Sequence, residues 1–528
     1  MAGRHNVRNP WGNSRALIGR TCLVFVLLSI AWRLVRYSLN FPLWGDEAFL
    51  ATSFFVRDFE GMFRPLEYGQ IAPLGFLWAV RAITNVFGLS EYSLRLFPLL
   101  IGLVTVPIFW RLATKLLGTR TGMLSVCVFS ASYFPMRYGV EFKPYGLDLF
   151  CSLILTYLAC SVLRRPDSYL KWTLLIVAGV LFMWCSYPSV FVAGGVGLVL
   201  TARLLRKPTK TLVIGWLLFN SLVVASFGCM FLFFAKPHYN AASWLSEMPM
   251  WTSAFPPLTQ PWKLPFWLVR THTGELLAYP VGGKVGASTV PFLLACTGVI
   301  VLWRKRRELA FLLLSPLLLT FIAACMHRYP YGGGPRVSLY LAPAFCILIG
   351  VGLGAVLRRC LPRRKLAKGL RITALIFLFI LFAGIGRDLV KPYKGKANLL
   401  NRTVVQAIAE SAPPGETWVT FNSLNNAHHA PNLYGWGGSG ARFRYYVSRL
   451  APGEVRWAPT AEDVCASLKS PVRLLAYRDN KVEFPRDLLD AYLRDLSACA
   501  VLGNPRTLVL EEAEAILIYD VRPCAEDE

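Results

Sequence analysis

The chain has 528 residues, of which 55% are hydrophobic and only 16% are charged, and its mean hydropathy is +0.45. Soluble globular proteins carry about 25% charged residues, so this composition excludes an ordinary soluble protein and indicates a polytopic membrane protein. A net charge of +26 would suggest a nucleic-acid partner for a soluble protein. Here the basic residues cluster between apolar runs, where the positive-inside rule expects them, so we expect no nucleic-acid partner.

Eleven apolar runs are each near the roughly 20 residues that a bilayer requires. They cover 17–37, 93–114, 121–138, 144–163, 172–187, 189–204, 211–234, 288–303, 308–326, 337–357 and 370–388. The basic tail 1–16 lacks a small-residue cleavage site, which favours a retained anchor over a cleaved signal peptide. The fifth and sixth runs are short and only Pro188 separates them, so this pair is the least distinct.

The loops between the runs alternate in charge. One set is strongly basic, with "KLLGTR", "RRPDSYLK", "RLLRKPTK", "RKRR" and "RRCLPRRKLAKGLR", and the other set is poorer in Lys and Arg, with "RYGVEFK", "SYPS" and "HRYPYGGGPR". The positive-inside rule then predicts a cytoplasmic N-terminus. It also predicts that the long loop 38–92, the loop 235–287 and the region 389–528 lie outside.

The region 389–528 has a different composition from the predicted transmembrane domain, 17–388. It alternates candidate strands ("TWVTFN", "VRLLAYR", "AILIYDV") with a candidate helix ("RDLLDAYLRDL"), which predicts a small extracytoplasmic α/β domain. Most of the 13 cysteines lie in apolar runs. Cys465 and Cys499 lie in this polar region, where an oxidising face would allow a disulfide, but their spacing does not decide whether they pair.

The segment "FPLWGDEAFL", residues 41–50, places two adjacent carboxylates, Asp46 and Glu47, just after the first apolar run. They could be a solvated pair at the interface, and Asp46 could be the N-cap of the helix that follows. The other interpretation is chemical, because a carboxylate can accept a proton from an attacking hydroxyl.

A second polar segment, "RYGVEFKPYGLDLF" at 137–150, lies between the third and fourth runs and contains Glu141, Lys143 and Tyr145. Ionisable residues at membrane depth are costly and are usually functional. The alternative is a Glu141–Lys143 pair on the surface of a short loop.

A third segment, "MHRYPYGGGPRVSLYLAP" at 326–343, lies between the ninth and tenth runs and contains His327, Arg328, Tyr331, Arg336 and three glycines. Glycines allow a backbone to approach a ligand, and a guanidinium matches a phosphate. A tight turn with snorkelling arginines would give the same pattern. Together the three segments suit an anionic, lipid-linked substrate at the membrane surface.

These segments resemble a known family. "WGDEAF" resembles the acidic motif in the first outer loop of GT-C glycosyltransferases, in the branch that contains protein O-mannosyltransferases, the aminoarabinose transferase of lipid A and RgtA/B/C/D-like enzymes. Residues 71–118 resemble the loop helix and second span of that branch, "YGVEFKPYGLDLF" the opening of its fourth span, and "HRYPYGGGPRVSLYLAP" a late outer loop. The resemblance covers roughly residues 20–390 and does not extend to the C-terminal region.

The resemblance implies an inverting transfer of a sugar from a polyprenyl-phosphate carrier to a lipid, glycan or protein acceptor. The transfer would occur at the outer face of a membrane, which the resemblance implies is a bacterial inner membrane. Asp46 would be the base for the acceptor hydroxyl, with Glu47 beside it. The substrate-binding residues would be Glu141, Lys143 and Tyr145 at the donor, and Arg336 with His327 or Arg328 at the carrier phosphate, near Tyr331.

Some relatives bind a divalent cation near the acidic motif, but no clear set of metal ligands is apparent here, so we expect no required metal or cofactor. His428 and His429, in the polar segment 425–441, lack identifiable partner ligands. The competing interpretation is a secondary transporter of an anionic lipid or solute. Transporters often show inverted repeats and acids at mid-membrane, whereas no repeat is apparent here and these acids lie in loops. A non-catalytic assembly subunit is a third interpretation.

Overall fold

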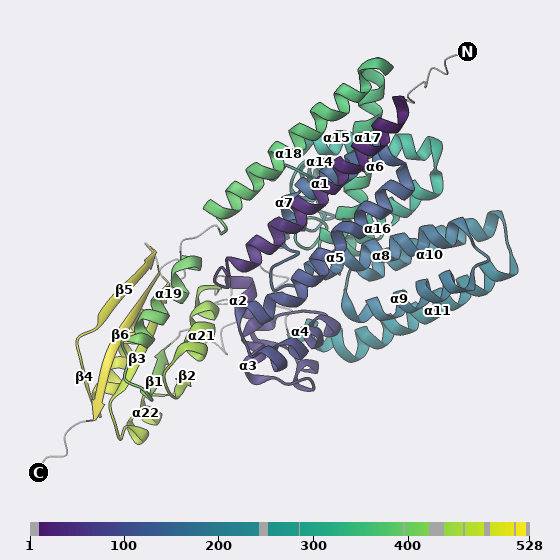
Figure 1. Cartoon of the computed structure of the whole chain (residues 1–528). Helices are drawn as coiled ribbons and strands as arrows, with labels where there is room; N and C mark the ends of the chain where they lie inside the picture. Colours follow the sequence, from purple (N-terminus) through teal and green to yellow (C-terminus); the bar gives the residue numbers. More distant parts are fainter. Residues whose placement is uncertain are drawn as a thin grey trace, which may run out of the picture. The chain divides into compact units, whose positions relative to one another are not determined.

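The computed structural model describes residues 10–241, 252–284, 286–393, 397–421, 438–457, 460–479, 486–511 and 514–523 (Figure 1). The chain divides into two compact units, each described here by itself. The transmembrane unit comprises Met1–Leu39 and Ile71–Val390, and the sheet unit comprises Asn40–Gln70 and Lys391–Glu528. His428, His429 and their neighbours in 425–437 lie outside the described residues.

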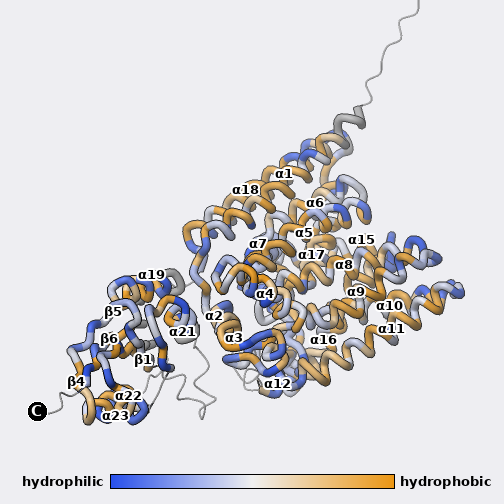
Figure 2. The backbone as a smooth tube through the Cα atoms, turned by 60° about the horizontal axis from the view of Figure 1, so that its bottom comes forward, coloured by the Kyte–Doolittle hydropathy of each residue, from blue (hydrophilic) through white to orange (hydrophobic). Residues whose placement is uncertain are grey.

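The transmembrane unit is α-helical. Its helices are α1 (Pro10–Ser38), α4 (Leu74–Phe87), α5 (Glu91–Leu117), α6 (Thr119–Ala131), α7 (Tyr133–Arg137), α8 (Tyr145–Arg164), α9 (Tyr169–Cys185), α10 (Ser189–Arg206), α11 (Lys210–Met230), α12 (Lys236–Ala241), α14 (Leu264–His272), α15 (Thr289–Lys305), α16 (Arg307–Cys325), α17 (Ala342–Cys360) and α18 (Leu366–Val390). Short turns of other helix types are η3 (Phe231–Ala235), η5 (Pro261–Lys263), η6 (Glu275–Leu277), η7 (Leu339–Leu341) and η8 (Arg363–Lys365). Figure 2 shows the long helices as mainly hydrophobic, with hydrophilic residues near their ends.

The fold class predicted from the sequence, a polytopic α-helical membrane protein, is confirmed. Within the described residues, eight helices are long and apolar enough to span a membrane: Ala16–Ser38, Glu91–Leu117, Tyr145–Arg164, Ser189–Arg206, Lys210–Ala241, Arg307–Cys325, Leu339–Cys360 and Leu366–Val390. Two shorter apolar helices, α4 and α9, accompany them. Each of the eleven predicted runs is helical, but those at 121–138, 172–187 and 288–303 are not among the eight.

The run 121–138 differs from the prediction in its continuity. The helix breaks at Ser132, which has an extended backbone, so the run forms α6 and α7 and not one long helix. Every residue of α6 from Gly122 to Ala131 is buried, and its neighbours are α1, α5, α17 and α18. Other helices of the bundle therefore surround α6, a feature that composition alone does not reveal.

Close helix contacts in this unit depend on glycine. Gly298 on α15 lies against the backbone of Leu348 on α17, and Gly352 on α17 lies against the backbone of Leu294 on α15. A Cβ at either glycine would collide with that backbone. Small residues allow helices in membranes to approach closely, so these glycines account for the tight α15–α17 packing.

The sheet unit contains six strands and, within the described residues, helices on both of its faces. The elements are α2 (Gly45–Ala51), α3 (Ser53–Val56), η1 (Gly61–Phe63), η2 (Glu67–Gly69), α19 (Ala397–Glu410), β1 (Trp418–Phe421), α21 (Gly438–Leu450), β2 (Val455–Trp457), α22 (Ala461–Ser467), β3 (Val472–Asp479), α23 (Arg486–Ser497), β4 (Ala500–Leu502), β5 (Arg506–Glu511) and β6 (Glu514–Pro523). The strand order is β2-β1-β3-β6-β4, and β5 also pairs with β6. β1 is parallel to β2 and β3, while β6 is antiparallel to its three neighbours.

Alternation along the strands determines how the helices cover this sheet. Val419, Phe421 and Leu474 point to one face, where α22 and α23 supply Val464 and Leu496 to the same core. Helix α19 contacts β5, and helix α21 contacts β3. Cys465 of α22 and Cys499 form a disulfide within this unit, a pairing that their spacing in sequence left open.

The structure divides the predicted outer loop 38–92 between the two units. Residues 40–70, which include α2 and α3, belong to the sheet unit, whereas α4 belongs to the transmembrane unit. Helix α2 packs on α21, which lies almost 400 residues further along the chain. The acidic motif is therefore folded together with the C-terminal region.

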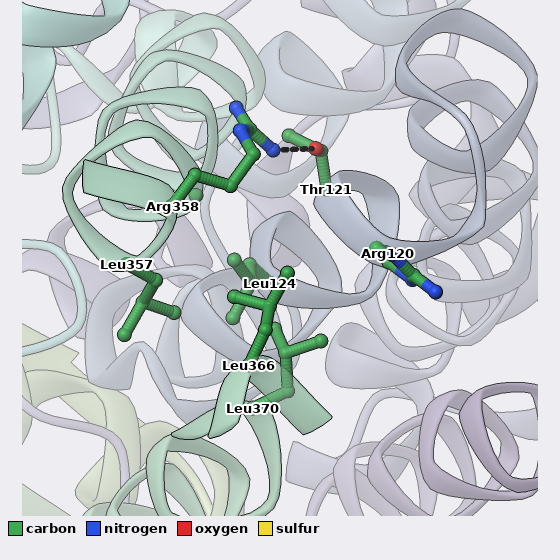
Figure 3. Close-up of a pocket in the computed structure, with 8 residues that line it drawn as sticks. Arg120, Thr121, Leu124, Leu357, Arg358, Leu366 and Leu370 are labelled. Carbon is green, nitrogen blue, oxygen red and sulfur yellow. Dashed lines mark hydrogen bonds between the residues drawn. The ribbon is translucent and has the colours of Figure 1, made fainter. Parts of the chain in front are cut away.

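A pocket lies among α6, α17 and α18 in the transmembrane unit, and its empty volume of about 310 Å³ includes space open to solvent (Figure 3). Its lining consists of leucines with two arginines, a threonine and a glycine: Arg120, Thr121, Leu124, Gly354, Leu357, Arg358, Leu366 and Leu370. Arg358 Nη1 donates to Thr121 Oγ1 at 3.5 Å. None of the site residues predicted from the sequence lines this pocket.

Candidate functional site

The two acids of the sheet unit occupy different environments. Helix α2 begins at Gly45, with Trp44 as its N-cap, so Asp46 is not the capping residue. Glu47 is fully buried, and its Oε2 accepts the backbone N–H of Trp44 at 3.3 Å, which holds the first turn. Asp46 lies in the same first turn but is only partly buried. Of the two carboxylates, Asp46 is the more exposed.

In the transmembrane unit, Glu141 lies in a buried ion network. Its Oε1 accepts from Arg36 Nη2 at 3.2 Å and from Arg137 Nε at 2.5 Å, and its side chain is 1% exposed. Arg36 also pairs with Asp388 near the end of α18. Charges buried this deeply are stable only when they are paired, so Glu141 joins α1, α7 and the loop before α8.

Asp388 has two further neighbours in this network. Trp32 Nε1 donates to its Oδ2 at 3.2 Å, and the hydroxyl of Tyr133 donates to its Oδ1 at 3.4 Å. Arg36 and Asp388 were not predicted as site residues from the sequence. Both are charged residues inside apolar runs, which was the available signal, but their pairing across 352 positions could not be read from the chain.

Lys143 and Tyr145 follow Glu141 at the start of α8. The Lys143 side chain is buried, and its backbone N–H donates to the carbonyl of Glu141 at 2.7 Å. The Tyr145 ring packs edge-on against Tyr138 with 5.4 Å between centroids. Glu141, Lys143 and Tyr145 thus lie together in the transmembrane unit, as neighbours in sequence must, and their role at the donor stays a prediction.

The loop 326–343 distributes its predicted residues over several environments. Tyr331 is buried, and its hydroxyl lies 2.9 Å from Nε2 of His272 on α14. His327 and Arg328 are exposed, and the His327 ring stacks on Phe255 with 5.0 Å between centroids. Arg336 is partly buried.

The glycines of this loop serve its own conformation. Gly332 and Gly333 have φ values of 80° and 72°, a region that other residues rarely adopt. A Cβ at Gly333 would also collide with Ala254. The sequence predicted that these glycines would let a ligand approach the backbone. At Gly333 the group that approaches closely is Ala254 of the same chain.

A buried polar cluster that was not predicted lies at the N-terminal end of α8. Asp148 is buried, with 7% of its surface exposed, and its Oδ1 has no hydrogen-bond partner among the described residues. The hydroxyls of Ser186 and Ser189, at the turn between α9 and α10, are buried and likewise without a partner there. Asp148 stood inside a segment that was singled out, but a single acid among leucines gave no spacing to interpret.

This cluster connects the second and third polar segments. Burial raises the pKa of Tyr329, and the nearby Tyr340, Asp148 and Tyr145 raise it further. Burial and Asp148 also raise the pKa of Tyr187. The structure therefore brings Tyr145 and Asp148 of one segment near Tyr329 of the other within the transmembrane unit.

No group of three or more His, Cys, Asp or Glu side chains in the described residues is arranged to hold a metal ion. In the acidic helix, Glu47 is engaged with the backbone of Trp44. The candidate residues of the sheet unit are carboxylates, which can accept a proton, and those of the transmembrane unit include cations, which can neutralise a phosphate.

Comparison with known proteins connects this arrangement to a family. A family model described as dolichyl-phosphate-mannose-protein mannosyltransferase matches residues 72–233. An uncharacterised protein of Aquifex aeolicus (strain VF5) is 29% identical over 160 residues, which are 30% of this chain and 31% of the relative. The match with that relative therefore spans less than a third of its length.

Two solved structures share the fold over nearly the whole chain. ArnT from Cupriavidus metallidurans, bound to undecaprenyl phosphate, has a TM-score of 0.55 at 14% identity, covering 94% of this chain and 97% of that one. The oligosaccharyltransferase of Archaeoglobus fulgidus in its apo form has a TM-score of 0.51 at 11% identity, covering 92% and 73%. At these identities the likeness concerns the fold alone. It shows that the chain has an ArnT-like fold, within which residues 72–233 match the dolichyl-phosphate-mannose-protein mannosyltransferase family model.

Proposed function

We propose that this protein transfers a sugar from a polyprenyl-phosphate carrier to an acceptor hydroxyl, with inversion at the anomeric carbon. The observation that carries the proposal is the pair of environments on α2, where Glu47 is buried on the backbone and Asp46 is only partly buried. The family match and the ArnT-like fold support the class of reaction. ArnT itself is the relative whose structure contains undecaprenyl phosphate.

In the proposed reaction, Asp46 accepts the proton of the acceptor hydroxyl as its oxygen attacks the anomeric carbon. The bond between that carbon and the phosphate oxygen breaks, and the carrier leaves as polyprenyl phosphate with the bonding electrons. A positioned general base contributes about 10²–10⁴-fold to such a step. Glu47 supports the reaction by fixing the first turn of α2, on which Asp46 lies.

Cations of the transmembrane unit supply the other half of the chemistry. Lys143 and Tyr145 are proposed to bind the donor, and Arg336 with His327 or Arg328 to neutralise the carrier phosphate. A guanidinium offers two parallel donors to a phosphate, and this favours the departing anion. Glu141 forms ion pairs with Arg36 and Arg137, and through these pairs it is proposed to hold the donor-binding region in place.

The proposed step uses a carboxylate base and cationic side chains, and it needs no bound metal or other cofactor. The described residues offer no group of three potential metal-binding side chains beside the acidic helix. Treatment of purified protein with EDTA is therefore expected to leave the rate unchanged. A rate that falls with EDTA and returns with a divalent cation would contradict this part of the proposal.

We also propose that the N-terminus is cytoplasmic and that the sheet unit lies outside a cell membrane, where the transfer occurs. The alternating basic loops support this orientation. The Cys465–Cys499 disulfide supports it independently, because disulfides persist in oxidising compartments.

The experiment that tests the function is mass spectrometry of membrane lipids, surface glycans and surface proteins from a deletion strain. The strain is complemented with the wild-type gene or with Asp46→Asn. Loss of one glycan in the deletion, restored by the wild type and not by Asp46→Asn, is the expected result and identifies the acceptor. Restoration by both would remove Asp46 as the base and favour a transport or assembly role.

A further inference from the structure

Side chains from the C-terminal region hold the backbone that leads into α2. The backbone N–H of Leu43 donates to the hydroxyl of Tyr446 on α21 at 2.7 Å. The hydroxyl of Tyr393 donates to the carbonyl of Pro42 at 2.9 Å. Leu43 and Tyr446 are both fully buried. Two successive residues before the helix are thus anchored by tyrosines that follow some 350–400 positions later.

A third anchor lies just upstream. Arg402 Nη1 on α19 donates to the carbonyl of Asn40 at 2.9 Å. The Tyr393 ring also packs edge-on against Phe41, with 6.1 Å between centroids. Every one of these contacts lies within the sheet unit.

The helix itself is anchored beyond its C-terminal end. Phe55 on α3 packs against Tyr445 on α21, with 5.5 Å between centroids. Arg444 of the same helix lies over the ring of Tyr68 at 5.8 Å and donates to its hydroxyl at 3.4 Å. Contacts therefore fix the acidic segment both before and after α2.

Helix α2 is seven residues long, and helices this short are not stable in isolation. Asp46 stands three residues after Leu43, so the orientation of its carboxylate depends on the backbone that Tyr446 and Tyr393 hold. A displacement of about 1 Å at a reacting group can cost about 10²-fold in rate.

We infer that the C-terminal sheet unit is a positioning device for the catalytic base, in which Tyr446, Tyr393 and Arg402 orient Asp46 through the backbone of residues 40–43. The inference rests on the proposed role of Asp46. It assigns a function to a region outside the part of the chain that resembles the family.

The test compares two Tyr→Phe variants of the full-length protein. Tyr446→Phe removes the hydroxyl that Leu43 uses, whereas Tyr492→Phe removes a hydroxyl with no hydrogen-bond partner among the described residues. The Tyr492 ring packs on Phe421 in the same unit, at 4.9 Å. Tyr446→Phe is expected to lower kcat about tenfold with an unchanged donor KM, and Tyr492→Phe to leave both unchanged. Equal rates for the two variants would overturn the inference.

A double variant separates positioning of Asp46 from a general loss of structure. In the Asp46→Asn background, adding Tyr446→Phe is expected to cause no further loss, because Tyr446 acts through Asp46. A further tenfold loss in that background would show that Tyr446 acts elsewhere and would contradict the inference. If Tyr446→Phe does not fold, Tyr393→Phe provides the same test at the carbonyl of Pro42.

The outcomes also distinguish this inference from the proposed function. Wild-type transfer rates in Asp46→Asn would remove Asp46 as the base, and with it both the proposed mechanism and this inference. Slow transfer in Asp46→Asn combined with wild-type rates in Tyr446→Phe and Tyr393→Phe would retain the base and reject only the positioning role.

Discussion

Single charged side chains in the transmembrane unit differ in how fully their charge is compensated. Glu141 is enclosed and contacts two arginines, whereas Glu308 pairs with Arg203 at 3.0 Å on a side chain that is 36% exposed. Solvent screens an exposed pair, but a buried pair depends on each partner for its solvation. The two glutamates therefore form a natural comparison.

Replacement of Glu141 by glutamine is expected to lower stability by about 3–5 kcal/mol, because it removes the carboxylate that pairs with Arg137 and one of the two carboxylates that pair with the buried Arg36. Replacement of Glu308 by glutamine should cost less than about 1 kcal/mol. Thermal unfolding of the detergent-purified variants measures both. Similar melting temperatures for the two variants would show that Glu141 is not a structural pairing residue.

The pH dependence of stability is expected to include a contribution from the protonation of His272. Its Nδ1 lies 2.8 Å from the carbonyl of Leu268 and its Nε2 lies 2.9 Å from the hydroxyl of Tyr331, an arrangement that a neutral ring satisfies. Burial lowers the pKa of His272, so the folded state binds fewer protons than the unfolded state. Its stabilising contribution is complete above the unfolded pKa of about 6.5 and is lost as the pH falls through the lower folded value.

His272→Gln should therefore reduce the fall in melting temperature between pH 7.5 and pH 5, whereas His327→Gln, at an exposed ring, should leave that fall unchanged. The melting temperature of each variant across this range is the measurement. An unchanged acid sensitivity in His272→Gln would assign the effect to other groups.

At the scale of elements, the apolar runs predicted where helices lie better than they predicted how many helices are long enough to span a membrane. Pro188 alone suggested the break between 172–187 and 189–204, and the structure places α9 and α10 on either side of it. The break inside 121–138 was missed, although Pro135 gave a local signal for it. Whether a helix faces lipid or other helices depends on packing, and α6 shows that sequence composition does not contain that information.

The sheet unit was predicted from three strands and one helix, and the structure contains β1, β3, β6 and α23 at those positions. The strands β2 and β4 were missed because each is only three residues long, and β5, whose apolar Leu508 and Val509 are exposed, was missed as well. Their pairing order follows from contacts that are distant in sequence. Periodicity within a segment carries no information about such pairing.

The Cys465–Cys499 disulfide closes a loop with a sequence separation of 34 and joins α22 to the end of α23. Its removal by Cys465→Ser is expected to destabilise the sheet unit by about 2–4 kcal/mol, by relaxing a constraint on the unfolded chain. Limited proteolysis of the sheet unit in urea measures the change. Cys360→Ser, at an exposed free thiol, is the control and should have no effect; equal resistance of both variants would contradict the prediction.

At the scale of the whole molecule, the sequence predicted the fold class and placed Asp46 and Glu47 together, since they are adjacent. It could not predict that residues 40–70 fold with the C-terminal region, because the contacts of Leu43 with Tyr446 and of Pro42 with Tyr393 cross about 350–400 residues. The ion network of Glu141 was hidden for the same reason. Adjacent candidates could be read from the chain, but their partners could not.

The proposed orientation predicts which cysteine an impermeant reagent can reach. Cys360, at the end of α17, lies in a strongly basic segment that should face the cytoplasm. In a variant whose only free thiol is Cys360, an impermeant maleimide should label lysed but not intact cells. Placing the thiol instead in the sheet unit by Ser411→Cys should give labelling of intact cells, and the reverse pattern would invert the topology.

The most direct test of the central claim is transfer of radiolabelled sugar from polyprenyl-phosphate donors by isolated membranes that contain wild-type, Asp46→Asn or Glu308→Gln protein. Asp46→Asn should fold normally and lose at least about 10²-fold in rate, because it lacks the base, while Glu308→Gln should retain the wild-type rate. Transfer at the wild-type rate by correctly folded Asp46→Asn would contradict the account and place the chemistry elsewhere in the chain.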